Sequence, residues 1–327
     1  MKSRNIIFAA ALTVLSLSAL ASGDLLRTAG EPVQLTSGET YFIQPLWSPQ
    51  GDRLALAGDN YAGLWSIPPE GGQPRQISDL PGAGFQPAWD PSGTRIACRV
   101  SRVENQRKLS AIAVYDLDKG TATELTEYVK EVGLPRWIEG GRQLLYPEDG
   151  RPQTAQAPGA VKTDPAGEEI IVTIQNDAIA VQRSPWEQTD ILKPLEDRIL
   201  WAELSPDGGR IVFEALGAEL YVTDLSGGEL VSLGRGERPR WSPDGEWIAY
   251  MITEDDGYRM LAADIFAIGR DGSGKTALTE TPDRLEMNPH WSPDGGTIAC
   301  DTRGEGIILL IPVEVSGETE GGDSPER

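Results

Sequence analysis

The sequence is poor in the residues that build metal centres and hydrolase active sites. Its 327 residues include one histidine, His290, and two cysteines. A single histidine excludes a site with several histidine ligands, which many catalytic zinc centres use. No Gly-x-Ser-x-Gly segment occurs, so the nucleophile elbow of α/β-hydrolases is lacking. We therefore expect a non-enzymatic protein with no metal and no other cofactor.

Basic residues are also scarce. The chain has 29 Lys and Arg against 50 Asp and Glu, which gives a formal net charge of −21. A field of this sign repels nucleic acid and anionic membrane surfaces, so we expect neither as a partner. Acidic segments such as Glu254-Asp-Asp256 lack the ligand spacing of a known calcium loop, and whether Ca²⁺ binds is left open.

Long apolar runs are missing except at the N-terminus. Lys2 and Arg4 precede an apolar stretch over residues 6–20, and Ala19 and Ala21 supply the small residues that a signal peptidase reads. The stretch is short for a membrane span. We expect a signal peptide at residues 1–21, a periplasmic or secreted mature protein and no membrane span after cleavage.

Six similar corners repeat along the chain. Each resembles Trp-Ser-Pro-Asp-Gly, and they begin at Trp47, Trp89, Trp137, Leu204, Trp241 and Trp291. Their spacings are 42, 48, 67, 37 and 50 residues, close to the propeller period of about 40–50 in four of five cases. A β-type run follows each corner, and then a second strand and a Gly-rich turn, which is typical of four-stranded blades.

The pattern predicts an all-β fold, a six-bladed β-propeller over residues 22–315 followed by an acidic disordered tail over residues 316–327. Only three strands follow the last corner. The segment Pro32-Val-Gln-Leu-Thr36 resembles the last strand of other blades. We expect this N-terminal strand to join the last blade and close the ring, which would remove exposed sheet edges.

The long spacing between Trp137 and Leu204 leaves two interpretations of residues 142–203. In one, the third blade is enlarged around residues 148–200 by a hairpin near Ala178 and Asp190. In the other, the segment holds a seventh blade that lacks its corner. About 25 extra residues are few for a full blade, so we favour six blades.

The corners followed by Ile-Ala-Tyr-like strands resemble the TolB-type propeller repeat over roughly residues 32–313. The resemblance implies a periplasmic propeller and, for TolB proper, docking to a peptidoglycan-associated lipoprotein. TolB carries a domain before its propeller, whereas only about 25 residues separate the expected cleavage site from Trp47. The chain is therefore similar to a stand-alone TolB-like propeller. Related propellers also precede the hydrolase domain of prolyl oligopeptidases.

Two further patterns have a structural interpretation. Residues 269–276 match the P-loop pattern, but a short strand broken by Pro282 follows where a helix is required, so we expect a hairpin turn. Cys98 and Cys300 occupy the same strand position in blades that are not neighbours. We expect them to be buried free thiols too far apart for a disulfide bond.

The segments just before the corners are the candidate site. Five of them contain Pro two residues before the Trp, and in a propeller they form the innermost strands around the central channel. Arginine can hold a carboxylate with two parallel hydrogen bonds, or it can simply pair with an acid of the chain such as Glu203. We expect nine ligand- or partner-binding residues at the channel mouth: Gln44, Gln86, Arg136, Trp201, Glu203, Arg238, Arg240, Asn288 and His290.

These observations favour a monomeric, exported scaffold that binds a protein, a peptide or a cell-envelope component. A rigid ring that presents many loops suits recognition. The alternative is a propeller-type enzyme, a lyase or a lactonase, that acts at the central channel.

Overall fold

The protein is an all-β propeller of seven blades. The computed structural model describes residues 25–159, 169–184 and 189–316, and the expected signal peptide and nearly all of the acidic tail lie outside these ranges. Two short 3₁₀ turns, η1 (Asp59–Tyr61) and η2 (Glu139–Gly141), interrupt the strands. No helix among the described residues is long and apolar enough to cross a membrane.

Each blade is one antiparallel sheet, and the blades are numbered here in chain order. Blade 1 contains β3 (Phe42–Trp47), β4 (Leu54–Gly58), β5 (Ala62–Ile67) and β6 (Arg75–Pro81). Blade 2 contains β7 (Ala88–Trp89), β8 (Arg95–Glu104), β9 (Arg107–Asp116) and β10 (Thr121–Glu124). Blade 3 contains β11 (Arg136–Ile138), β12 (Gln143–Glu148) and β13 (Arg151–Gln156).

The second half of the chain forms the remaining four blades. Blade 4 contains β14 (Ile170–Gln175), β15 (Ala178–Arg183) and β16 (Thr189–Leu192). Blade 5 contains β17 (Ile199–Leu204), β18 (Arg210–Ala215), β19 (Glu219–Asp224) and β20 (Leu230–Arg235). Blade 6 contains β21 (Glu237–Trp241), β22 (Trp247–Asp255), β23 (Met260–Gly269) and β24 (Thr276–Ala277). Blade 7 contains β25 (Glu286–Trp291), β26 (Thr297–Thr302), β27 (Ile308–Ser316), β1 (Leu25–Thr28) and β2 (Val33–Gln34).

The prediction of six blades is wrong. The hairpin expected near Ala178 and Asp190 is β15 and β16, which pair with β14 in a separate sheet rather than extending blade 3. Blades 3 and 4 have three strands each in the described chain, so both fit into a spacing judged too short for two four-stranded blades. Blade 4 has no Trp-Ser-Pro-Asp-Gly corner, which is why the repeat pattern did not reveal it.

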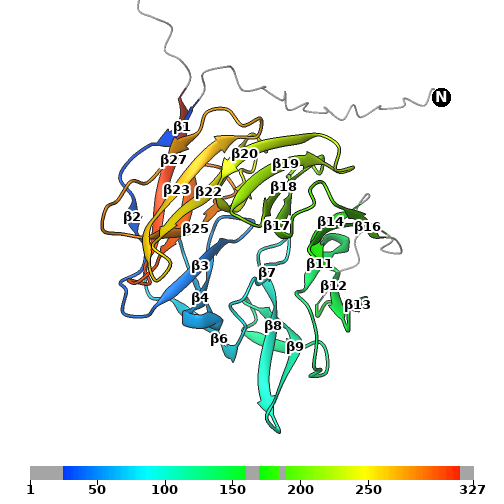
Figure 1. The fold of residues 1–327 in the computed structure, drawn as a ribbon. Coiled ribbons are helices and arrows are strands. Elements are labelled where there is room, and N and C mark those ends of the chain that lie inside the picture. Colours follow the sequence, from blue (N-terminus) through cyan, green and yellow to red (C-terminus); the bar gives the residue numbers. More distant parts are fainter. Residues whose placement is uncertain (1–24, 160–168, 185–188, 317–327) are drawn as a thin grey trace, which may run out of the picture.

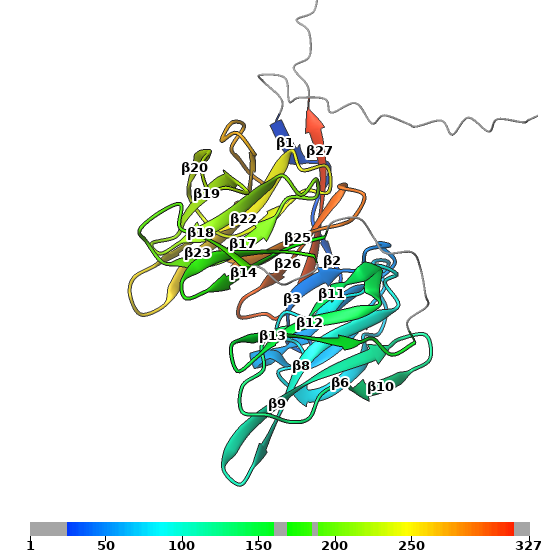
Figure 2. The same ribbon diagram turned by 90° about the vertical axis from the view of Figure 1, so that its right-hand side faces the viewer.

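The two ends of the described chain meet in blade 7. Val33 of β2 pairs with Leu310, and Leu25 of β1 pairs with Ser316, so both N-terminal strands lie along β27. Figure 1 shows the blue β2 beside the orange-red β27, and Figure 2 shows β1 against the end of β27.

Apolar clusters between neighbouring blades form the core. Six clusters of buried side chains join blades 1 and 2, 2 and 3, 4 and 5, 5 and 6, 6 and 7, and 7 and 1. Among the described residues, no such cluster joins blades 3 and 4. A polar contact is found there instead, because the Glu169 carboxylate accepts hydrogen bonds from the amides of Glu139 (2.6 Å) and Gly140 (3.0 Å).

The corners are turns closed by their own side chains. In blade 5 the Ser205 hydroxyl donates to Asp207 at 2.6 Å, and the amide of Arg210 donates to Ser205 at 2.9 Å. The Ser205 hydrogen bond is the main reason that the pKa of Asp207 is lowered. Gly208 adopts a φ of 72°, a left-handed conformation that glycine tolerates without strain. These contacts give the corner residues a scaffold role.

Four of the five corner tryptophans join their blade to the one before it. The indole Nε1 of four of them donates to the backbone carbonyl just before the preceding corner, at 2.8–3.2 Å. The pairs are Trp89 with Leu46, Trp137 with Ala88, Trp241 with Glu203 and Trp291 with Arg240. Trp47 differs, because its buried Nε1 has no partner among the described residues.

Both structural interpretations of the minor patterns are confirmed. The P-loop-like segment is the turn between β23 and β24, two paired strands, and no helix follows. Cys98 and Cys300 are buried free thiols. Burial raises the pKa of Cys98 to about 12 and that of Cys300 well above its ordinary value, so neither is a reactive thiolate.

Candidate functional site: the central cavity

One cavity of about 450 Å³ lies where the innermost strands of the blades meet. Each of the seven blades contributes at least one wall residue, from β3, β11, β14, β17, β21 and β25 and from the segment that ends in β7. The nine residues predicted from the sequence all line it: Gln44, Gln86, Arg136, Trp201, Glu203, Arg238, Arg240, Asn288 and His290. Their proximity is established, whereas their role in binding stays a prediction.

A backbone feature directs four of these residues. Gln44, Gln86, Arg238 and Asn288 each precede a proline and adopt φ values of 48–55°. A following proline disfavours the right-handed α conformation, which these residues do not adopt. Gln44, Arg238 and Asn288 also lie at register shifts in the strand pairing, which mark β-bulges. Such a bulge turns the backbone amide and the side chain away from the regular ladder.

Carboxylates of the preceding blade accept two of these four backbone amides. The Gln44 amide donates to Asp301 at 2.6 Å, and the Arg238 amide donates to Glu214 at 3.0 Å. The side-chain amide of Asn288 also donates a hydrogen bond to Asp301, at 3.1 Å. Burial raises the pKa of Asp301 to about 7 and also raises that of Glu214. These acids hold the wall in shape from behind rather than facing the cavity.

The three arginines of the cavity are not equivalent. Arg240 forms an ion pair with Glu203 at 2.9 Å, with both side chains about a quarter exposed. The guanidinium of Arg238 lies 5.0 Å from the ring centre of Trp201, and that of Arg240 lies 4.7 Å from the same ring. Arg136 donates a hydrogen bond to the carbonyl of Pro135 at 3.4 Å, and burial lowers its pKa. Among the described residues, neither Arg136 nor Arg238 forms a close ion pair. Glu203 acts on Arg136 at longer range, and Glu214 and Asp301 lie within the electrostatic reach of Arg238.

His290 contributes shape and polarity rather than charge. Burial, with the nearby Arg240, lowers its pKa to about 3, so the imidazole is neutral at ordinary pH. Its Nδ1 lies 3.4 Å from the amide nitrogen of Trp47 and 3.1 Å from the carbonyl oxygen of Trp291. These contacts link the last innermost strand to the first.

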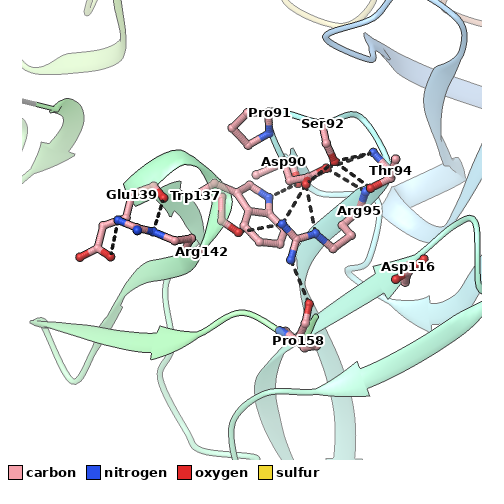
Figure 3. A network of polar contacts seen from close by, with 12 residues as sticks. Asp90, Pro91, Ser92, Thr94, Arg95, Asp116, Trp137, Glu139, Arg142 and Pro158 are labelled. Carbon is pink, nitrogen blue, oxygen red and sulfur yellow. Dashed lines mark hydrogen bonds and ion pairs between the residues drawn. The ribbon is translucent and has the colours of Figure 1, made fainter. Parts of the chain in front are cut away.

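A buried ion pair fixes the strand that carries Arg136. Arg95 of blade 2 pairs with Asp90 at 2.9 Å, and the two side chains are 12% and 1% exposed. Figure 3 shows Arg95 against the ring of Trp137, whose centre is 4.7 Å from the guanidinium carbon. Arg95 also donates to the carbonyls of Gly141 (2.7 Å) and Pro158 (2.9 Å). Blade 3, and with it Arg136, is therefore held to blade 2.

Sequence reasoning missed the part of the wall that blade 4 supplies. Ile170, Ile171 and Val172 of β14 line the cavity next to the polar residues. The signal was present in the apolar run that leads into Asn176 and Asp177, whose φ values of 50° and 62° are those of a type I′ hairpin turn. An apolar strand before such a turn predicts a hairpin even where the corner is missing.

The described residues contain no group of three or more His, Cys, Asp or Glu side chains that could hold a metal ion. Glu203 is the sole carboxylate among the lining residues in the part of the chain that the structure describes. The donor set of the cavity is therefore amides, guanidinium groups and indoles, which suits a ligand with anionic and apolar parts.

Comparison with curated proteins gives a partial match. The uncharacterized peptidase YuxL of Bacillus subtilis (strain 168) is 28% identical to the chain over 139 residues. The match covers 35% of this chain and 20% of YuxL, so the chain spans about a fifth of that relative. No family model matches the chain.

Solved structures support the fold. A TolB candidate from Agrobacterium tumefaciens matches with a TM-score of 0.51 and 18% identity, over 90% of this chain and 99% of that one. An oligogalacturonate lyase in complex with manganese matches with a TM-score of 0.50 and 11% identity, over 90% and 99% of the two chains. At these identities the likeness concerns architecture alone. The chain is a β-propeller, an architecture that it shares with both of these proteins.

Proposed function

We propose that this protein is a non-catalytic, exported propeller scaffold that binds a protein or peptide partner at the mouth of its central cavity. The observation that carries the proposal is the meeting of nine polar and aromatic residues in one cavity, with Arg136 and Arg238 forming no close ion pair among the described residues. A cavity of about 450 Å³ is within the usual size of small-ligand and peptide-anchor pockets.

The proposed cellular location and partner rest on features of the sequence. The basic and apolar start of the chain supports export to the periplasm or beyond after removal of residues 1–21. The resemblance of the repeats to the TolB-type propeller supports a partner in the cell envelope, and we propose a peptidoglycan-associated lipoprotein as one candidate. We propose that the exported chain acts as a monomer.

We also propose that the N-terminal strands keep the ring closed. Support comes from the pairing of β1 and β2 with β27 and from Leu26, which is 2% exposed within the cluster that joins blades 6 and 7. Without this pairing, the β27 edge would be open to other strands.

The competing function is catalysis at the same cavity, by a lyase or a lactonase. The structural likeness to an oligogalacturonate lyase and the partial match to a peptidase are the reasons to test for catalysis. Incubation of the purified protein with oligogalacturonate, with and without added Mn²⁺, would show unsaturated products if the protein were such a lyase.

Site-specific photo-crosslinking tests the binding proposal. A benzophenone amino acid would replace Gln86, which lines the cavity, or Val103, which is 76% exposed at the end of β8. We expect a discrete envelope protein to be captured from position 86 and not from position 103, and capture to fall when Arg238→Gln is added. Equal capture from both positions, or none, would contradict the proposal.

A further inference from the structure

The central cavity is locally basic although the chain as a whole is acidic. Three arginines and one glutamate line it, and the neighbouring His290 is neutral because burial lowers its pKa to about 3. The whole chain carries a formal charge of −21. An anionic group therefore meets repulsion over most of the molecule and attraction in this cavity.

The positive charge that is available belongs to two of the three arginines. Arg240 is occupied by Glu203, which holds it at 2.9 Å. Among the described residues neither Arg136 nor Arg238 forms a close ion pair: Arg136 contacts a backbone carbonyl and Arg238 an aromatic ring, while Glu203, Glu214 and Asp301 act on them only at longer range. Both guanidinium groups can therefore still take a carboxylate, which is their best partner because two parallel hydrogen bonds form.

The cavity also has an apolar wall close to these charges. Ile170, Ile171 and Val172 of β14 and Leu204 of β17 are half-buried lining residues, and Ile170, Val172 and Leu204 also pack against the cluster between blades 4 and 5. A volume of about 450 Å³ holds a short chain end or one to two large side chains, not a folded domain. The occupant thus carries a carboxylate beside an apolar group.

We propose that the cavity recognises an acidic peptide segment, with its carboxylate between Arg136 and Arg238 and an adjacent apolar side chain against Ile170, Ile171 and Val172. This inference rests on the proposed binding function and names the chemistry of the partner. The carboxylate can be that of an Asp or Glu side chain or that of a C-terminus, since both present the same two oxygens. The Arg240–Glu203 pair forms the neighbouring wall and keeps Trp201 in place.

Fluorescence anisotropy with defined peptides tests this inference. The probe is a fluorescein-labelled pentapeptide that ends in Leu-Leu-Glu with a free C-terminus. Three comparison peptides carry Gln in place of Glu, an amide in place of the C-terminal carboxylate, or both changes. We expect the doubly neutral peptide to bind at least tenfold more weakly. The two single replacements show which carboxylate the cavity holds.

Matched variants locate the effect in the cavity. Arg136→Gln and Arg238→Gln should each weaken the acidic peptide about tenfold or more and leave the neutral peptide unaffected. Arg259→Gln changes the net charge equally, but its side chain is 79% exposed in the turn between β22 and β23, so binding should be unchanged. The peptide comparison on the unaltered protein does not depend on the folding of any variant.

The outcomes separate this inference from the function on which it rests. Equal binding of the acidic and neutral peptides would overturn carboxylate recognition and leave peptide binding standing. No binding of any peptide at millimolar concentration would overturn both. Oligogalacturonate that binds in an Arg238-dependent manner, while the peptides do not, would overturn the peptide assignment and support the enzyme.

Discussion

Single atoms of the corner tryptophans join neighbouring blades. The indole nitrogen of Trp241 donates to the carbonyl of Glu203 at 3.2 Å, and Glu203 is itself a wall residue of the cavity. The same carboxylate that pairs with Arg240 also accepts the amide of Trp241. The scaffold and the candidate site thus share side chains, so a change in one is expected to alter the other.

Replacing a corner indole by a phenyl ring should reveal the contribution of this hydrogen bond. Trp241→Phe removes a donor and leaves the Glu203 carbonyl without its partner, so we expect a loss of about 1 kcal/mol beyond that of ring size. Trp47→Phe is the matched control, because the Trp47 Nε1 has no partner to lose within the described part of the chain. Urea unfolding of both variants measures the difference, and equal losses would contradict the role of the hydrogen bond.

The buried Asp90–Arg95 ion pair should contribute far more to stability than the exposed Asp52–Arg53 pair at the corner of blade 1. Asp90→Asn leaves a buried guanidinium without its counter-ion, which costs about 3 kcal/mol. Asp52→Asn disturbs a pair whose side chains are 49% and 29% exposed, so the loss should be below about 1 kcal/mol. Thermal and urea unfolding provide the comparison. A small effect at Asp90 would show that Arg95 finds another partner.

The buried Asp301 predicts a pH dependence of stability with a defined sign. Burial raises its folded pKa to about 7, above the ordinary value of 3.8, so folding favours the protonated carboxyl. The contribution is complete below about pH 4 and is lost as the pH rises to about 7. Relative to Asp301→Asn, the unaltered protein should therefore lose stability over this interval. Urea unfolding at several pH values measures the difference in stability between the two proteins. A difference that stays constant with pH would contradict the raised pKa of Asp301, a value that already includes the lowering effect of the nearby Arg238 charge.

At the scale of elements, the blades are not equally supported. The middle strands of blades 1, 2, 5, 6 and 7 lie between apolar clusters on both sides, whereas β12 and β15 have such a cluster on one side only among the described residues. The Glu169 carboxylate, which bridges to the amides of η2, is the main described contact across the junction of blades 3 and 4.

This asymmetry predicts the pattern of local opening. Amides of β12 and β15 should exchange with deuterium faster than those of β8 and β18, because less apolar surface must be exposed to release them. Glu169→Gln should accelerate exchange at both strands further and leave β8 and β18 unchanged. Uniform protection across the four strands would contradict the interpretation of this junction as the weakest of the ring.

At the scale of the whole molecule, the sequence predicted the wall of the cavity better than the number of blades. The segments before the corners identified nine of the wall residues, because the corner fixes where each innermost strand lies. Blade 4 has no corner, so Ile170 and its neighbours were missed. The acids behind the wall could have been found, since Asp301 and Glu214 both occupy the fifth position of the strand after a corner. That they accept amides from the next blade follows only from the ring geometry.

The central claim is that the cavity ringed by seven innermost strands is the binding surface. Titration calorimetry of the envelope partner captured by crosslinking, with the unaltered protein and with Arg136→Gln combined with Arg238→Gln, tests it most directly. We predict that the double variant binds about a hundredfold more weakly, while Arg259→Gln binds like the unaltered protein. Equal affinity of the double variant would contradict the claim and place the partner on another surface.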